Sequence, residues 1–204
     1  DGIVGEYTRD LINAPYVVSS RPVWLDPNRP LGERALVFSL NEKLNNIKEI
    51  PNNSNRAPRI REYFKRATRL VNGKETTLNI TSGPWCAAAA CYATYKVLLN
   101  DEKMPHKYRI SGLELIADSI HNNTWYLAHL VQKKHYKIKI GDIAIFNRST
   151  DKKHTAWWRH VARVAIVPNK HGTFVTLGGN EEGMYKLTKR NINDIKFLGC
   201  IGYP

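Results

Sequence analysis

The chain has 204 residues, of which 42% are hydrophobic and 24% are charged, a composition that excludes an intrinsically disordered protein. No apolar stretch approaches the roughly 18–20 residues that a membrane-spanning helix requires, so no membrane span is expected. The net charge of +13 favours anionic partners. The possible anionic partners are nucleic acids, acidic membranes and cell-wall polymers, because net charge alone does not distinguish among them.

The first 40 residues are rich in proline and turn-forming residues, as in SSRPVWLDPNRPLGER, with one short apolar run at 35–40. This composition predicts an arm or small cap that packs on a larger unit. We therefore expect residues 1–40 to form that arm and residues 41–204 to form the main domain. A chain of this length suits one domain with a substantial core.

Helical spacing of apolar side chains dominates the chain up to about residue 120, and strand-like patterns follow it. The expected helices lie at 39–50, 59–71, 84–99 and 111–120. The expected strands lie at 132–140, 143–146, 160–167, 172–179 and 196–203. Helices followed by strands favour the α+β class, with helices packed on an antiparallel sheet of about four to six strands.

The stretch GPWCAAAAC places Cys86 where a Gly-Pro-Trp turn becomes an alanine-rich helix. The first turn of a helix carries a partial positive charge and unpaired N–H groups, which lower the pKa of a thiol and favour the nucleophilic thiolate. Pro84 suits that turn, because its missing N–H is not needed there. Cysteine is also often a small core residue. The alanines that follow fit a buried helix, so this stretch alone favours the structural alternative.

A cysteine hydrolase also needs a base and a group that orients the base. His160 begins the apolar strand HVARVAIV, whereas the other histidines lie in polar, loop or helix-surface contexts. Asn180 follows the next strand in TLGGN, where Gly178 and Gly179 permit a close approach of the backbone. Each of these residues is more often structural when it is taken singly. The combination of Cys86, His160 and Asn180 nevertheless predicts a catalytic site.

The segments GPWC, IGDIAIFNR, RHVARVAIV and LGGNEEG together resemble the CHAP family of cysteine, histidine-dependent amidohydrolases/peptidases, over about residues 41–202. The resemblance implies a papain-like core and a catalytic domain over 41–204. It makes Cys86 the nucleophile, His160 the general base and acid, and Asn180 the residue that orients the histidine. The chain departs from the family at Gly178, because many relatives carry an acidic residue there (EGN where this chain has GGN).

The resemblance also implies substrate-binding residues. Trp85 matches the aromatic residue beside the nucleophile and is expected to line the groove. Trp158 lies in the insertion KKHTAWWRH, where it would either stack on sugar rings or cap the sheet. Asp142 matches the family's Gly-Asp before the central strand, and we group it with the substrate-binding residues, although a turn or strand-end role is expected for it rather than catalysis.

No C-x-x-C pair occurs among the three cysteines, so a zinc site or a redox dithiol has little support, and no metal or cofactor is expected. Cys91 and Cys200 are expected to be buried free thiols, with a disulfide between them as the alternative.

The resemblance implies cleavage of amide bonds in peptidoglycan through a thioester, by a protein that is secreted, periplasmic or delivered to the cell wall. The expected partner is peptidoglycan or another anionic wall polymer, and a protein inhibitor or delivery partner would fit as well. Three alternatives remain: a papain-like protease or acyltransferase that acts on protein, an inactive wall-binding domain, and a basic nucleic-acid-binding module. No nucleic acid is expected, because the chain has no zinc-finger, RRM or KH signature.

Overall fold

The computed structural model describes residues 22–50, 56–71, 74–77, 84–100, 102–148 and 159–203. Its helices are the short 3-10 helix η1 (Val23–Leu25) and α2 (Leu31–Leu44), α3 (Pro58–Phe64), α4 (Cys86–Lys96), α5 (Gly112–His121) and α6 (Ala128–Gln132). Its strands are β1 (Thr68–Val71), β2 (Lys74–Thr77), β3 (Trp125–Leu127), β4 (Ile143–Asn147), β5 (Arg159–Ile166), β6 (Thr173–Glu181), β7 (Met184–Asn191) and β8 (Phe197–Ile201).

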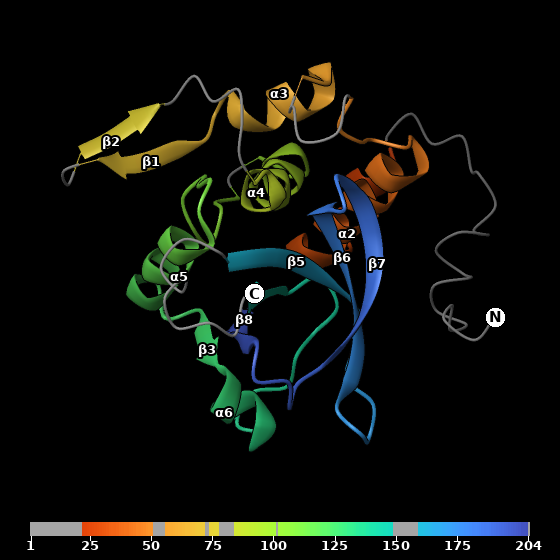
Figure 1. Ribbon diagram of the computed structural model, residues 1–204, viewed down its shortest axis with the longest axis vertical. Helices are drawn as coiled ribbons and strands as arrows, with labels where there is room; N and C mark the ends of the chain where they lie inside the picture. Colours follow the sequence, from red (N-terminus) through yellow and green to blue (C-terminus); the bar gives the residue numbers. More distant parts are fainter. Residues whose placement is uncertain are drawn as a thin grey trace.

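Six of the strands form one antiparallel sheet in the order β3-β8-β4-β5-β6-β7, and β1 and β2 form a separate hairpin. The expected α+β class and the antiparallel sheet are therefore confirmed. Figure 1 shows β6 and β7 as long curved ribbons that lie side by side, with α2, α3 and α4 at one end of the view and β3 and α6 at the other.

The two faces of the sheet carry two apolar clusters, because side chains along a strand alternate between faces. On the face covered by α4, Ile143, Ile145 and Val161 are buried against the helices. The opposite face carries a second buried cluster that includes Phe146 and Phe174. The central strands β4 and β5 are thus covered on both faces, which holds the residues at their ends in fixed positions.

Helix α4 sits directly against the sheet because its first turns carry only small side chains. Residues 86–90, one cysteine and four alanines, are all buried. Arg163 of β5 reaches across and donates hydrogen bonds to the carbonyl oxygen of Ala90 at 3.0 Å and to the hydroxyl of Thr94 at 2.9 Å. These bonds fix the helix relative to β5, the strand that carries His160.

Several expected boundaries differ from the structure. The expected boundary between residues 40 and 41 falls inside α2, whose Ala35, Leu36 and Phe38 belong to the main core; residues 1–21 lie outside the described part. The helix expected over 59–71 ends at Phe64 and is followed by β1. The strand expected over 132–140 does not form, and the end of α6 and a series of turns occupy that stretch.

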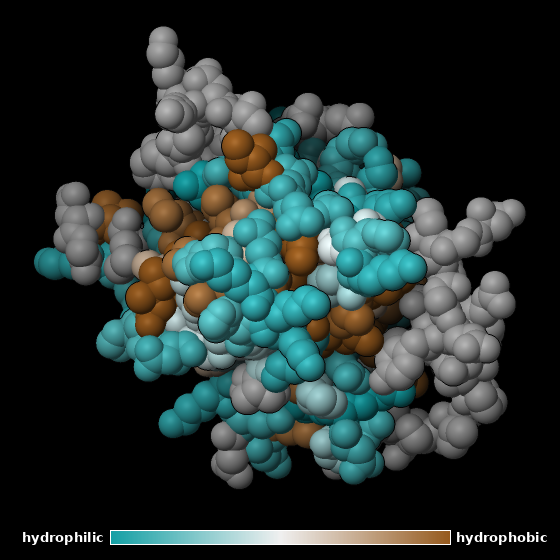
Figure 2. Space-filling model, turned by 90° about the horizontal axis from the view of Figure 1, so that it is seen from below, coloured by the Kyte–Doolittle hydropathy of each residue, from teal (hydrophilic) through white to brown (hydrophobic). Residues whose placement is uncertain are grey.

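The molecular surface fits the charged composition of the chain. Figure 2 shows a face on which hydrophilic side chains predominate and apolar ones form separate patches. Within the described ranges, none of the helices has the length and apolar character needed to cross a membrane.

Candidate active site

Cys86 is the first residue of α4, and the residue is 3% exposed. Pro84 and Trp85 precede the helix, which was expected to begin at Pro84, and the thiol lies in the first turn as predicted, where the helix dipole acts most strongly. The thiol donates to the carbonyl oxygen of Arg159 across 3.8 Å. This contact places the sulfur at the start of β5.

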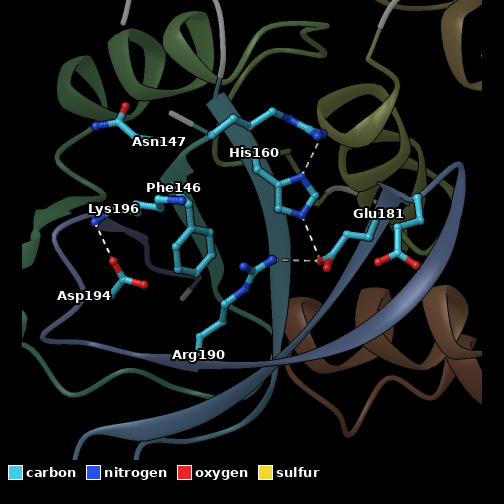
Figure 3. A pocket seen from close by; sticks show the side chains of 9 residues that line it. Phe146, Asn147, His160, Glu181, Arg190, Asp194 and Lys196 are labelled. Atoms are coloured by element: carbon cyan, nitrogen blue, oxygen red, sulfur yellow. Dashed lines mark hydrogen bonds and ion pairs between the residues drawn. The ribbon is translucent and has the colours of Figure 1, made fainter. Parts of the chain in front are cut away.

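His160, the second residue of β5, lies close enough to Cys86 for its charge to lower the pKa of the thiol. Its Nε2 atom lies 2.9 Å from Oε1 of Glu181, at the end of β6. Figure 3 shows the imidazole between this carboxylate and a guanidinium group on its other side. Because Glu181 holds Nε2, Nδ1 is the nitrogen that can exchange a proton with Cys86.

Glu181, and not the side chain of Asn180, contacts His160. The amide group of Asn180 makes no hydrogen bond to the described residues, and the backbone of Asn180 is left-handed, with φ at 59°. The pairing of β6 with β7 shifts register between Gly178 and Glu181. Such a bulge redirects the side chains that follow it, and here it brings position 181 to the histidine. The sequence signal for this residue was the acidic pair that follows Asn180 in LGGNEEG.

Gly178 leaves the space that this carboxylate needs. A Cβ atom at position 178 would lie 2.6 Å from Oε1 of Glu181 and 2.7 Å from Nε2 of His160. No side chain fits there without displacing one of these groups. The absence of a side chain at position 178 thus makes room for a carboxylate from three residues further along the chain.

Glu181 is itself held by two further groups. The Thr188 hydroxyl donates to its Oε2, and Arg190 Nη2 lies 3.2 Å from its Oε1. The pKa of Glu181 is lowered, because the hydrogen bond and the charge of His160 outweigh the opposing effect of burial. A carboxylate with this pKa stays ionised at neutral pH and holds His160 through Nε2.

The electrostatics favour a thiolate at Cys86. Burial by itself raises the pKa of a thiol. At Cys86, the hydrogen bond to His160, together with the positive charges of His160 and Arg148, overcomes burial and lowers the pKa to about 6. At His160 burial works in the other direction, yet the hydrogen bonds to Cys86 and Glu181 raise its pKa. The two shifts together favour a thiolate–imidazolium pair at neutral pH.

Arg148, just beyond the end of β4, adds a positive charge beside Cys86 and His160. The sequence did not single out this residue as part of the site. Its Nη2 atom lies 3.8 Å from Sγ of Cys86, 3.1 Å from Nδ1 of His160 and 3.3 Å from the carbonyl oxygen of Asn180. Its position after the strand motif IAIFN was the available signal, because strand ends commonly carry site residues. An arginine keeps its charge at any pH relevant to proteins.

Two of the three expected substrate-binding residues, Trp85 and Asp142, are buried away from a groove. Trp85 is fully buried, and its Nε1 atom donates to Glu49 at 2.9 Å, so it is a core residue. Asp142 is also buried, and it accepts hydrogen bonds from the backbone N–H groups of Lys139 and Tyr203. Asp142 therefore stabilises the turn before β4. Trp158 lies outside the described residues.

Cys91 and Cys200 are both buried and free, so the expectation of free thiols is confirmed and the disulfide between them is excluded. Burial raises the pKa of Cys91 to about 12 and that of Cys200 well above its ordinary range. These environments suppress thiolate formation. Cys86 is the cysteine whose surroundings favour the reactive form.

A cavity of about 260 Å³ adjoins the site at His160 and Arg148. Its wall is mostly charged, and Figure 3 shows several of these side chains around it. The lining residues are Phe146, Asn147, Arg148, His160, Glu181, Glu182, Arg190, Asp194 and Lys196. Among the described residues, no group of three or more His, Cys, Asp or Glu side chains is arranged to hold a metal ion.

The fold and this geometry define an α+β protein with a Cys86–His160–Glu181 constellation at the junction of a helix and an antiparallel sheet. Searches with protein-family models, among curated proteins and among solved structures found no match to this chain. The resemblance to the CHAP family, with its papain-like core, thus stays a prediction that rests on the quoted motifs. The chemistry below is argued from the site itself.

Proposed function

We propose that the protein is a cysteine-dependent hydrolase of peptide amide bonds in peptidoglycan, built on a papain-like core of the CHAP type. The observation that carries the proposal is a buried thiol with a pKa of about 6, at a helix N-terminus and beside a histidine that a carboxylate holds. A thiolate formed near pH 6 is available as a nucleophile at neutral pH, whereas an ordinary thiol with a pKa of about 8.5 is mostly protonated there.

The reaction follows from the arrangement. The Cys86 thiolate attacks the carbonyl carbon of the amide, and the carbonyl π electrons move to oxygen to give a tetrahedral oxyanion. When the oxyanion collapses, the C–N bond breaks, and Nδ1 of protonated His160 gives its proton to the leaving nitrogen. A thioester remains. Water then attacks the thioester carbon and loses a proton to His160, the C–S bond breaks, and the thiolate and the imidazolium are restored.

Two groups can stabilise the oxyanion in this scheme. The backbone N–H of Cys86 has no partner within the helix, because it belongs to the first turn. The guanidinium of Arg148 lies close to the sulfur. A positive charge aimed at developing negative charge lowers the barrier more in a buried site than in water.

The substrate class rests on charge and on the resemblance. A net charge of +13 suits a polymer that bears carboxylates and, in some walls, phosphates. The same chemistry could act on a protein substrate, and that is the second candidate function. An enzyme that acts on peptidoglycan would work at the cell wall.

The test is the release of new amines from purified sacculi of several chemotypes, with mass spectrometry of the fragments to identify the bond. We expect Cys86→Ala and His160→Ala to abolish release. The matched controls are Cys200→Ala, which removes a buried thiol elsewhere, and His129→Ala, which removes an exposed histidine. Both controls should stay active.

If the wild-type protein releases no amines from any sacculus, or if Cys86→Ala is as active as wild type, the proposal is wrong. Cleavage of casein without cleavage of sacculi would instead support the protein-directed alternative. Binding to sacculi without cleavage would support a wall-binding domain.

A further inference from the structure

The cavity beside His160 is lined by three carboxylates and by the cations Arg148, Arg190 and Lys196. Of its three negative groups, Glu181 is held by His160 and Arg190, and Glu182 pairs with Lys186 at 2.8 Å. The third, Asp194, accepts from the backbone N–H of Lys196 at 2.8 Å.

Two of the lining cations have no such partner. No carboxylate of the described residues lies within ion-pair distance of Arg148 or of the Lys196 ammonium group. The Nε atom of Arg148 is buried without a hydrogen-bond partner in the described part of the chain. A buried donor left unpaired costs free energy.

The catalytic protonation state frees a further donor of Arg148. A guanidinium has donors but no acceptor, so its 3.1 Å contact with His160 forms only while Nδ1 has a free lone pair. When Nδ1 carries the proton taken from Cys86, that contact becomes two donors facing each other. The Nη2 atom of Arg148 then still faces the carbonyl oxygen of Asn180 at 3.3 Å and the sulfur of Cys86 at 3.8 Å, and the N–H that faced Nδ1 is open to a ligand.

The position of the cavity indicates which side of the scissile bond would occupy it. His160 gives its proton to the leaving nitrogen, so the leaving half of the substrate must pass beside His160, where the cavity opens. At about 260 Å³ the cavity is smaller than the roughly 300–1,000 Å³ typical of pockets that enclose a whole small ligand. It suits one group of a larger substrate.

We propose that this cavity is a subsite for a carboxylate on the leaving-amine side of the scissile bond, held by Arg148 and Lys196. The preferred substrates are then amides whose leaving amine belongs to an amino acid with a free carboxylate. This inference rests on the proposed function for its meaning in catalysis, but the anion site itself can be tested without any substrate.

The first experiment compares iodoacetate with iodoacetamide, which differ only in a carboxylate and a carboxamide. Both reagents form a C–S bond with the same thiolate and expel iodide, so any change in the pKa of Cys86 cancels in the ratio of the two rates. Mass spectrometry reports labelling of Cys86, and glutathione measured in parallel gives the ratio for an ordinary thiol.

We expect the iodoacetate-to-iodoacetamide ratio at Cys86 to exceed that of glutathione by about tenfold or more, the range expected for hydrogen bonds to a charged group. Arg148→Gln should return the ratio to the glutathione value. The control Lys189→Gln removes an exposed charge from β7, outside the cavity, and should leave the ratio high. A wild-type ratio equal to that of glutathione, or one unchanged in Arg148→Gln, overturns the anion site.

The second experiment uses sacculi whose stem-peptide carboxylates are free or have been converted to amides with a carbodiimide and ammonia. Wild type should cleave the free form about tenfold faster or more, and Arg148→Gln and Lys196→Gln should each lose most of that preference. Equal cleavage of both forms overturns the carboxylate subsite while the proposed function stands. Cleavage of neither form contradicts the proposed function, and the alkylation ratio still decides whether the anion site exists.

Discussion

Replacing Glu181 with glutamine tests whether a carboxylate at the end of β6 activates the site. Glutamine has nearly the same size, so it can keep the contacts with Thr188 and Arg190 but cannot keep the negative charge. In the wild-type protein this charge faces Nε2 of His160 at 2.9 Å and raises the pKa of the histidine. Without it, the imidazolium is less stable, and the thiolate at Cys86 loses part of its counter-charge.

The size of the effect follows from the type of bond that is lost. A hydrogen bond to a charged group contributes about 1.5–3 kcal/mol, so we expect a loss of roughly 10- to 100-fold in kcat/KM. If half or more of that energy reaches the thiolate through His160, the pKa of Cys86 should rise from about 6 by roughly one unit. The variant should stay folded, because the substitution removes a charge without opening a cavity.

Two measurements check this prediction: amine release from sacculi, and the pH dependence of Cys86 labelling by iodoacetamide. Glu75→Gln is the control, because it also removes an ion-paired carboxylate, but one in the separate hairpin. The reasoning is refuted if Glu181→Gln keeps both the wild-type rate and the wild-type labelling midpoint. A slower rate with an unchanged midpoint would show that Glu181 only orients the ring.

Three further predictions concern the same site. Labelling of Cys86 should rise with pH through about 6 and then level off, because the pKa of its thiol is lowered. Cys91, whose thiol has a pKa of about 12, should stay unlabelled in the folded protein. A labelling midpoint for Cys86 near 8.5, as in a free thiol, would contradict this prediction. Gly178→Ala should reduce amine release at least about tenfold, since its Cβ would lie 2.7 Å from Nε2 of His160 and overpacking costs about 1–3 kcal/mol. Circular dichroism should show that this variant is folded. Full activity of the variant would show that the site can shift to make room for the methyl group. Asn180→Gly should keep most of the amine-releasing activity, because the side chain of Asn180 does not contact His160 and glycine accepts its φ of 59°. A loss of activity as large as that of Cys86→Ala would instead support a catalytic role for the Asn180 amide.

The position of the cysteine illustrates how local and non-local information combine. Pro84 and the alanines after Cys86 specify a helix start from a few adjacent residues, and α4 begins at Cys86, two residues after the expected start. Whether the thiol is a core residue or a nucleophile depends on what lies next to it in space. His160 and Arg148 come from positions 74 and 62 residues further along the chain, which are the differences 160 − 86 and 148 − 86.

The errors in secondary structure also have physical causes. Residues 132–140 alternate in polarity as a strand does, but among them the backbone of Lys134 is left-handed, with φ at 61°, and the stretch turns instead of pairing with a neighbour. Strand β7 was not predicted because it lies at the edge of the sheet and its sequence MYKLTKRN is largely polar. Edge strands bury less apolar surface, so their pattern in the sequence is weak.

The sequence by itself determined the α+β class, the helix that begins at Cys86 and most strands of the sheet, because periodicity, proline and alanine act over a few neighbouring residues. It also marked His160, since a histidine at the start of an apolar strand stands out. Only the tertiary structure placed Glu181 against His160, because a register shift in the pairing of β6 with β7 decides which side chain faces the imidazole. The burial of Trp85 and the place of Arg148 likewise depend on packing between segments far apart in the chain, which no local pattern encodes.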